Sequence, residues 1–221
     1  EGVNCLLPRK AGLRTEELDP RHVATGVKTT IELPEGVVAD RFGLGPDEGA
    51  AMLMVGSVTD GLPGGGFLYT NRDSISLGLV ITVAGLRERR TAPADLMERL
   101  KAHPAIAPLT AGGKVVEYSA HLVPEGGAHM MPALYGDGVL VAGDAAGFVL
   151  NLGYSVRGMD FAIASGMHAA DAVIAAKEKG DFSKEALAGY EARLRDSFVL
   201  RELEHYRNAP HFIGTTPRLF S

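Results

Sequence analysis

Alternating apolar and polar residues predict that much of the first half of the chain is β-sheet. Residues 75–83 are apolar at every second position, which is the cleanest period-two pattern in the sequence. Residues 27–33 repeat it, with Val, Thr, Ile and Leu alternating with Lys, Thr and Glu, and residues 116–122 give one more copy. Because successive side chains of a strand point to opposite faces, each segment is predicted to be a strand, and residues 27–33 a half-buried one.

Two further segments complete the predicted sheet. Residues 66–70 read GFLYT and are followed by Asn-Arg-Asp, which predicts a hairpin with the strand at residues 75–83. Residues 51–55 read AMLMV, a continuous apolar run. Such a run is typical of a strand that is covered on both faces, so we expect it to lie deep in the sheet.

Helical periodicity appears once within this region. Residues 93–103 place Leu96, Met97 and Leu100 on one face, and Pro104 ends the pattern because it cannot continue a helix. We expect this to be the single helix that interrupts the sheet.

Two helices are predicted in the last third of the chain. The first begins near Arg157 and Gly158 and ends at Gly180, a residue type favoured just after a helix. Its apolar residues, spaced by about one turn, are Met159, Ile163, Met167, Ala170 and Ile174.

The second helix begins after Ser183, a favoured N-cap, and we expect it to persist to about Arg207 and to end at Pro210. Its core-facing stripe is Leu187, Tyr190, Leu194 and Phe198.

The junction between the strand at residues 139–142 and the helix near Arg157 carries the strongest candidate chemistry. The strand ends in Gly-Asp-Ala-Ala-Gly, and a loop leads to the helix. A helix N-terminus favours negative charge, and an acidic side chain can accept hydrogen bonds from sugar-alcohol hydroxyls. The junction therefore fits a ribityl chain and a pyrophosphate. A plain turn with Asp144 as its turn residue would show the same short motif, so the motif alone leaves both interpretations open.

A family resemblance favours the first interpretation. The segment GDAAGFVLNLGYSVRGMDFAIASG resembles the second flavin-binding motif of the glutathione-reductase-type FAD oxidoreductases. More narrowly, it is similar to the FixC branch of the electron-transfer flavoprotein–quinone oxidoreductase family. The opening EGVNC resembles that family's Asp-Gly-x-Asn-Ser segment, and residues 181–184, 209–210 and 216–220 also look like the FixC branch. The resemblance spans nearly the whole chain.

The resemblance implies an α+β fold. An antiparallel-sheet substrate domain with an inserted helix would join the C-terminal part of a glutathione-reductase-type FAD-binding domain. The expected parts are a remnant of the FAD-binding domain (1–20), the substrate domain (21–135), the second FAD motif (136–180) and a C-terminal helical segment (181–221). The implied cofactor-binding residues are Gly2, Asn4, Gly143, Asp144, Ala145, Gly147, Arg157, Gly158 and Met159. No catalytic acid or base is implied, because the redox chemistry is the flavin's own.

The implied function is that of an FAD-dependent oxidoreductase, which passes electrons from an electron-transfer flavoprotein toward quinone or a ferredoxin-like iron–sulfur partner. The expected location is cytoplasmic, with peripheral contact at the inner membrane left open. Two alternatives also stay open. One is another flavin enzyme of the same fold, either an aromatic hydroxylase or a prenyl reductase, and the other is a non-catalytic interaction domain.

The sequence lacks the G-x-G-x-x-G turn that holds the ADP half of FAD in such enzymes. Gly43-Leu44-Gly45 has neither the spacing nor a following helical pattern. We therefore expect a fragment without the N-terminal dinucleotide-binding motif. Alone, it should be inactive, bind FAD weakly or not at all, and self-associate through the open edge of the strand at residues 139–142.

Composition argues against several other classes of protein. The net charge of −5 disfavours nucleic acid as a partner. The single cysteine excludes an internal disulfide, and the histidines lack the spacing of metal ligands. The triple glycine at residues 64–66 is not followed by Lys-Ser/Thr, so it is not a P-loop. No apolar run approaches the roughly 20 residues that a membrane-spanning helix needs.

Overall fold

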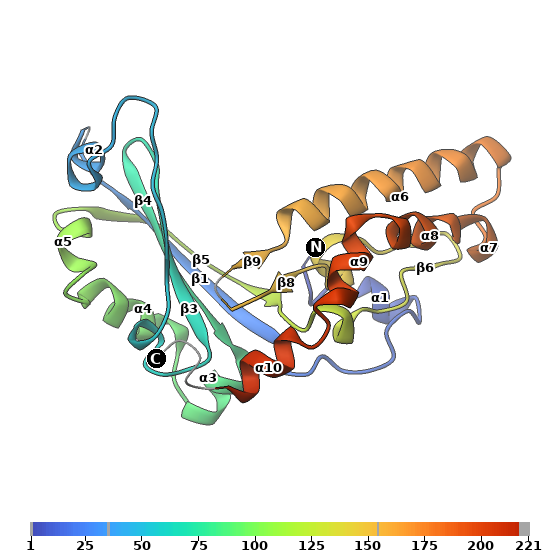
Figure 1. The fold of residues 1–221 in the computed structure, drawn as a ribbon, viewed down its shortest axis with the longest axis horizontal. Coiled ribbons are helices and arrows are strands. Elements are labelled where there is room, and N and C mark those ends of the chain that lie inside the picture. Colours follow the sequence, from blue (N-terminus) through green and yellow to red (C-terminus); the bar gives the residue numbers. More distant parts are fainter. Residues whose placement is uncertain (1, 35, 154, 217–221) are drawn as a thin grey trace. The chain divides into compact units, whose positions relative to one another are not determined.

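The computed structural model describes residues 2–34, 36–153 and 155–216, and these residues form two compact units. Unit 1 contains the described residues of 2–23 and 122–216, and unit 2 contains those of 24–121 (Figure 1). The mixed α+β class with an antiparallel sheet is confirmed. Glu1 and residues 217–220, which contribute to the sequence resemblance, lie outside the described residues.

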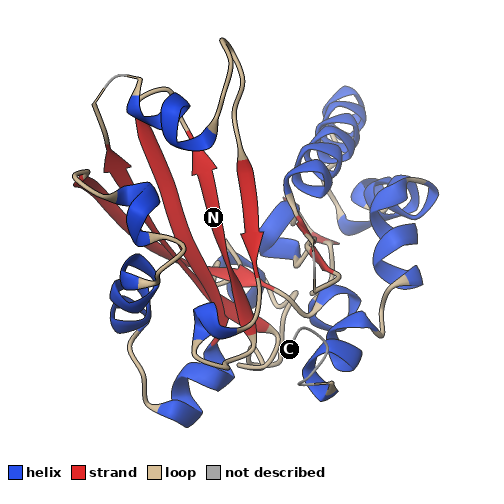
Figure 2. Cartoon of the chain, turned by 60° about the vertical axis from the view of Figure 1, so that its left-hand side comes forward, coloured by secondary structure: helices blue, strands red, loops and turns tan. Residues whose placement is uncertain are grey.

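Unit 2 is built on a five-stranded sheet with the order β2-β3-β4-β1-β5 (Figures 1 and 2). The β2–β3, β3–β4 and β1–β4 pairs are antiparallel, and the β3–β4 pair confirms the predicted hairpin. The strands are β1 (Val23–Glu32), β2 (Ala51–Met54), β3 (Gly64–Thr70), β4 (Ser74–Thr82) and β5 (Lys114–Pro124).

One face of this sheet forms the core of unit 2. Helix α4 (Pro93–Ala102) contributes Leu96, Met97 and Leu100 to the core, as its periodicity predicts. The alternating apolar residues of β1 and β4 lie in the same core, which confirms their predicted orientation. Its buried members are Val27, Ile31, Leu33, Val38, Leu62, Leu68, Ile75, Leu77, Leu79, Ile81, Leu96, Met97, Leu100 and Ile106.

The prediction that residues 51–55 lie deep in the sheet is wrong. Strand β2 is the terminal strand of the sheet, and the Leu53 side chain is 59% exposed. Burial depends on the place of a strand in the sheet, which an apolar run alone does not encode.

The prediction of a single helix in this region is also wrong. Unit 2 contains α2 (Val37–Phe42), α3 (Val83–Arg89) and α5 (Ala107–Thr110) besides α4. Strand β4 ends at Thr82 because its side-chain oxygen accepts a hydrogen bond from the Gly85 backbone N–H at 3.3 Å. This N-cap starts α3 where the apolar alternation would have continued.

Unit 1 is mainly helical (Figure 2). Its helices are α1 (Leu7–Lys10), α6 (Met159–Lys179), α7 (Lys184–Leu187), α8 (Gly189–Asp196), α9 (Phe198–His205) and α10 (Ala209–Thr215). Two short antiparallel ladders pair β6 (Tyr135–Gly136) with β7 (Val139–Leu140) and β8 (Leu150–Asn151) with β9 (Val156–Arg157). Tyr190 anchors the core of this unit, and its hydroxyl donates to the Val141 carbonyl at 2.9 Å.

The strand predicted over residues 139–142 is shorter and paired differently. In the described chain it is the two-residue β7, which is antiparallel to β6. The turn at Asp137 and Gly138, with Gly138 at φ +67°, joins the two strands.

The helix predicted from Ser183 to Arg207 is divided into three. Ser183 caps α7 as predicted, by accepting from the Ala186 N–H at 3.3 Å. Ser197 has an extended backbone and caps α9, by accepting from the Val199 N–H at 3.1 Å. Pro210 lies in the first turn of α10, where its missing N–H costs nothing, so it does not end a helix as predicted.

Helix α6 ends at Gly180, which has a φ of +66°, as predicted. Its buried face is formed by Phe161, Ser165, Ala172 and Ala176. The apolar stripe found from the sequence lies mostly on the exposed side, and Met159 is 84% exposed. We call Met159, Ile163, Met167 and Ile174 the α6 stripe.

Candidate functional site

The Gly143–Ala146 segment forms a tight 3-10 turn between β7 and β8. Gly143 and Gly147 have φ values of +55° and +77°, which suit glycine. The Gly143 N–H donates to the Ser165 Oγ of α6 at 3.0 Å, and the Phe148 N–H returns to the Gly143 carbonyl at 3.1 Å. The turn is therefore fixed to the first half of α6.

The structure brings two predicted site residues, Asp144 and Gly158, together. Gly158 is the N-cap of α6, and a Cβ added to it would lie 3.9 Å from Asp144 Oδ1 and 3.1 Å from Val149 Cγ2. Asp144 is half-buried, and its carboxylate has no hydrogen-bond or ion-pair partner among the residues that the structure describes. The carboxylate beside a helix start is thus available to accept hydrogen bonds from hydroxyl groups.

Arg14 connects the start of the chain to this turn. Its guanidinium donates to the Val3 carbonyl at 3.1 Å, to the Ala145 carbonyl at 3.3 Å and to the Met130 carbonyl at 3.4 Å. Burial lowers the pKa of Arg14 from its usual value. The segment that carries Gly2 and Asn4 is therefore held next to the segment that carries Ala145, as a shared site requires.

Arg157 is engaged in ion pairs within unit 1. Its Nη1 lies 2.5 Å from Glu202 Oε2 on α9, and its Nε and Nη2 both donate to Asp160. The guanidinium carbon also lies 5.0 Å from the centre of the Phe161 ring. These contacts fix the start of α6 to α9, and a role of Arg157 in binding a cofactor remains a prediction.

Glu125 is a buried acid that the sequence did not bring to notice. It is 8% exposed, and burial raises its pKa to about 7, against the opposing effect of a hydrogen bond from Asn151. The only sequence signal is the position of an acid before two glycines at the end of a strand. Its buried state depends on residues far away in the sequence.

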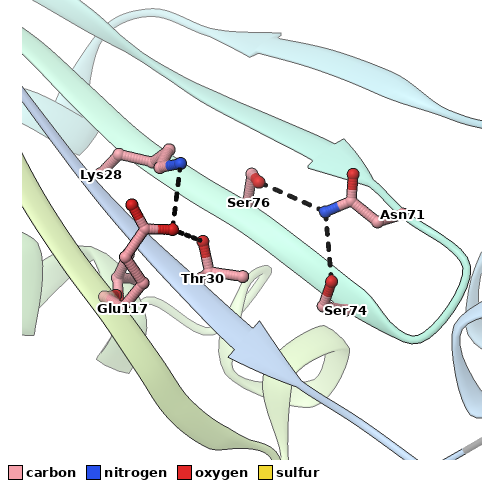
Figure 3. A network of polar contacts seen from close by, with 7 residues as sticks. Lys28, Thr30, Asn71, Ser74, Ser76 and Glu117 are labelled. Atoms are coloured by element: carbon pink, nitrogen blue, oxygen red, sulfur yellow. Dashed lines mark hydrogen bonds and ion pairs between the residues drawn. The ribbon is translucent and has the colours of Figure 1, made fainter.

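The face of the unit 2 sheet opposite its core is polar over β1, β4 and β5 (Figure 3). Glu117 accepts hydrogen bonds from Lys28 Nζ at 3.4 Å and from Thr30 Oγ1 at 3.0 Å. Asn71 donates to the hydroxyls of Ser74 and Ser76 at 3.2 Å and 3.3 Å (Figure 3).

The same face carries an aromatic pair on β3. Phe67 and Tyr69 stack with ring centres 5.1 Å apart. Register places Phe67 opposite Gly78 and Tyr69 opposite Ser76, so the pair shares the face of the polar network. A Cβ added to Gly78 would lie 2.1 Å from Phe67 Cζ, so the glycine lets the ring lie on the strand. We call Phe67 and Tyr69 the aromatic platform.

An open hollow of about 520 Å³ lies elsewhere in unit 2, lined by residues that include Glu32, Arg72, Asp73 and Lys114. Its lining also includes Leu33, Pro34 and Gly112, and Arg72 and Asp73 closely follow Tyr69 in the sequence. Among the described residues no group of acids, histidines or cysteines is arranged to hold a metal ion. The described helices also include none that is long and apolar enough to cross a membrane.

Comparison with known proteins relates this geometry to a family. A family model described as ETF-QO, ubiquinone-binding matches residues 47–123. A probable electron transfer flavoprotein-quinone oxidoreductase, YdiS, of Escherichia coli K12 is 52% identical over 221 residues, which are 100% of this chain and 51% of that protein. Over its whole length the chain is similar to FixC-like members of the electron-transfer flavoprotein–quinone oxidoreductase family.

Other relatives match the chain over the same extent. Protein FixC of Escherichia coli K12 is 52% identical, and Protein FixC of Rhizobium meliloti is 42% identical over 230 aligned positions. All of this chain is matched, against 51% and 52% of those proteins. The chain therefore spans about half the length of the curated relatives it matches.

Solved structures show the fold independently. A geranylgeranyl bacteriochlorophyll reductase-like protein from Thermoplasma acidophilum has a TM-score of 0.73 at 19% identity and covers 97% of this chain and 49% of its own. The flavin-dependent brominase Bmp2 has a TM-score of 0.59 at 18% identity, covering 99% and 52%. These similarities support the predicted fold class and do not bear on the reaction.

Proposed function

We propose that this chain provides the flavin-ring side and the quinone side of an FAD-dependent oxidoreductase, which passes electrons from an electron-transfer flavoprotein toward quinone. The observation that carries the proposal is the 52% identity over the whole chain to a probable electron transfer flavoprotein-quinone oxidoreductase, together with the ubiquinone-binding match at residues 47–123. A ferredoxin-like partner, a cytoplasmic location and contact with the inner membrane belong to the same proposal.

The Gly143 turn has the properties that an FAD site needs. The positive φ values of Gly143 and Gly147 let the backbone turn tightly here, and the unpartnered Asp144 carboxylate lies beside Gly158 at the start of α6. Asp144 would accept hydrogen bonds from the ribityl hydroxyls of FAD. The α6 N-terminus would stabilise negative charge on the pyrimidine side of the flavin ring. Gly2, Asn4, Ala145, Arg157 and Met159 complete the proposed site. When bound, FAD supplies the electron-transfer chemistry.

The aromatic platform suits a quinone ring. Its stacked rings offer a planar apolar surface, and such stacking contributes about 0.5–1.5 kcal/mol beyond the area buried. Lys28 and Asn71 on the same face carry N–H groups that could donate to quinone carbonyl oxygens. The platform lies within residues 47–123, the part of the chain that matches the ubiquinone-binding model.

A titration with FAD tests the first half of the proposal. For this test the chain is joined to the part of Escherichia coli FixC that it does not match. We call the joined protein the completed enzyme. Asp144→Asn should weaken FAD binding about 10- to 100-fold, since hydrogen bonds to a charged group contribute about 1.5–3 kcal/mol. Asp171→Asn, which changes an exposed acid on α6, is the control. Equal affinity in both variants contradicts the assigned role of Asp144.

Quinone kinetics test the second half. Phe67→Leu in the completed enzyme should raise the KM for a soluble quinone several-fold, since the stacking surface is lost, while FAD reduction keeps its rate. Tyr118→Leu removes an exposed aromatic residue from the opposite face of β5 and serves as the control. An unchanged KM in Phe67→Leu would show that the quinone binds elsewhere.

Prenyl reduction is a second candidate, because the sequence leaves open another flavin enzyme of the same fold. The two candidates differ in the acceptor. A prenyl reductase would saturate an isoprenoid double bond, which mass spectrometry of the product would show directly.

A further inference from the structure

Glu125 is held inside unit 1 by the turn that follows β5. Its N–H donates to the His22 carbonyl at 2.8 Å, and the next N–H, from Gly126, donates to Met130 Sδ at 3.2 Å. A Cβ added to Gly126 would lie only 2.7 Å from His22 Cβ, and Gly127 has a φ of +53°. Two glycines are therefore needed for the backbone to turn here while the acid stays inside.

No opposite charge compensates this carboxyl. Its backbone N–H is bonded to the carbonyl of His22, from the segment before β1, and its side chain interacts with Asn151 of β8; the His129 ring lies 6.5 Å from the ring of His22. Burial lowers the pKa of His22, so this imidazole is neutral at pH 7. Among the described residues, neither a lysine nor an arginine acts on Glu125. A buried carboxylate without a counter-charge is costly, so the carboxyl prefers to hold a proton.

The amide partner of Glu125 belongs to the hairpin that leads into the candidate FAD site. Asn151 pairs with Val156 in the β8–β9 ladder, and Leu150 pairs with Arg157. The next residue, Gly158, is the N-cap of α6 beside Asp144. A change of charge on Glu125 is therefore linked, through its interaction with Asn151 and a two-residue ladder, to the start of α6.

We propose that Glu125 is the redox-linked proton-holding residue of this site. If FAD is held at the site formed by Gly143, Asp144 and Gly158, it would take up the electron; the Glu125 carboxylate would then bind one proton from solvent at its Oε and release it when the electron leaves. The electron comes from the donor named in the proposed function, on which this inference rests. Charge is conserved, since the added negative charge is matched by the proton.

The mechanism sets the pH at which the effect appears. The pKa of Glu125 is about 7 before the electron arrives. Negative charge added at the candidate site would raise it further. Below pH 7 the carboxyl already holds its proton, so reduction takes up nothing at this residue. At pH 8 the carboxyl is ionised before reduction and can take up to one additional proton per electron.

Two measurements test the proposal. The first is infrared difference spectroscopy of the 221-residue chain between pH 5 and pH 9. A protonated-carboxyl band that titrates near pH 7 should be present in the native chain, absent in Glu125→Gln and unchanged in Glu178→Gln, a control at an exposed acid on α6. Persistence of the band in Glu125→Gln would overturn the assignment of the proton.

The second measurement is the midpoint potential of the completed enzyme against pH, with a chemical reductant and mediators. The potential should fall more steeply above pH 7 in the native protein and in Glu178→Gln, and this extra slope should be lost in Glu125→Gln. The same slope in all three proteins would overturn the redox link. Because no electron-transfer flavoprotein is used, failure of the proposed donor would leave this result intact, and the two ideas are separated.

Discussion

Replacing Glu125 by glutamine should remove a pH-dependent loss of stability from unit 1. In the native chain the pKa of this carboxyl rises from an ordinary value of 4.5 to about 7 because burial disfavours its ionised form. Each tenfold change in proton affinity corresponds to about 1.4 kcal/mol. The folded state therefore loses on the order of 3 kcal/mol of stability, relative to its value at low pH, as the carboxyl ionises.

The sign follows from which state binds the proton more tightly. The folded chain holds the Glu125 proton at pH values where the unfolded chain has released it. The contribution is therefore fully present below pH 4.5 and is lost as the pH rises through about 7. Glutamine is neutral throughout, so the free energy of unfolding of Glu125→Gln should exceed that of the native chain by an amount that grows from pH 5 to pH 8.

Urea unfolding at pH 5, 6, 7 and 8, read by pulsed hydrogen exchange, measures this difference. Peptides from α8 and α9 report the core of unit 1 separately from the sheet of unit 2, which avoids treating the two units as one transition. Glu178→Gln should follow the native chain at every pH. Parallel curves for Glu125→Gln and the native chain would refute a buried Glu125 without a counter-charge.

Three further predictions concern other features. Arg14→Lys should lower the free energy of unfolding of unit 1 by about 2 kcal/mol in the same exchange experiment, because an ammonium cannot span the separate carbonyls that the guanidinium binds. An unchanged free energy would show that these hydrogen bonds do not hold the two segments together. Gly78→Ala should displace the ring of Phe67, which a changed near-ultraviolet circular dichroism spectrum would show. It should also weaken quinone binding in the completed enzyme, as expected for Phe67→Leu. The double variant Ile163→Glu with Met167→Glu should reduce self-association of the 221-residue chain in sedimentation experiments, since it charges the exposed α6 stripe; undiminished association would place the contact elsewhere.

The parts of the fold that depend on local pattern could be predicted from the sequence. The β3–β4 hairpin, the inward face of α4 and the caps at Ser183 and Gly180 follow from residues that are close in the chain. The exposure of β2 could not be predicted, because it depends on the place of the strand in the sheet. Apolar spacing also does not specify which side of a long helix is covered.

In the candidate site, too, residues marked by a local motif could be predicted, and residues placed by distant contacts could not. Asp144 and Gly158 were found because a short motif and a family resemblance mark them, and the structure places them side by side. Arg14 was missed because its Ala145 partner lies 131 residues away, and no pattern around it indicates that contact. Glu125 was missed for the same reason, because burial by distant segments determines its pKa.

Stopped-flow reduction of the completed enzyme tests the central claim most directly. The FAD absorbance is followed after mixing with reduced electron-transfer flavoprotein or, separately, with NADPH. The account predicts rapid reduction by the electron-transfer flavoprotein, little reduction by NADPH, and reoxidation on adding quinone. Rapid reduction by NADPH without a response to the electron-transfer flavoprotein would contradict it and favour a hydroxylase or prenyl reductase of the same fold.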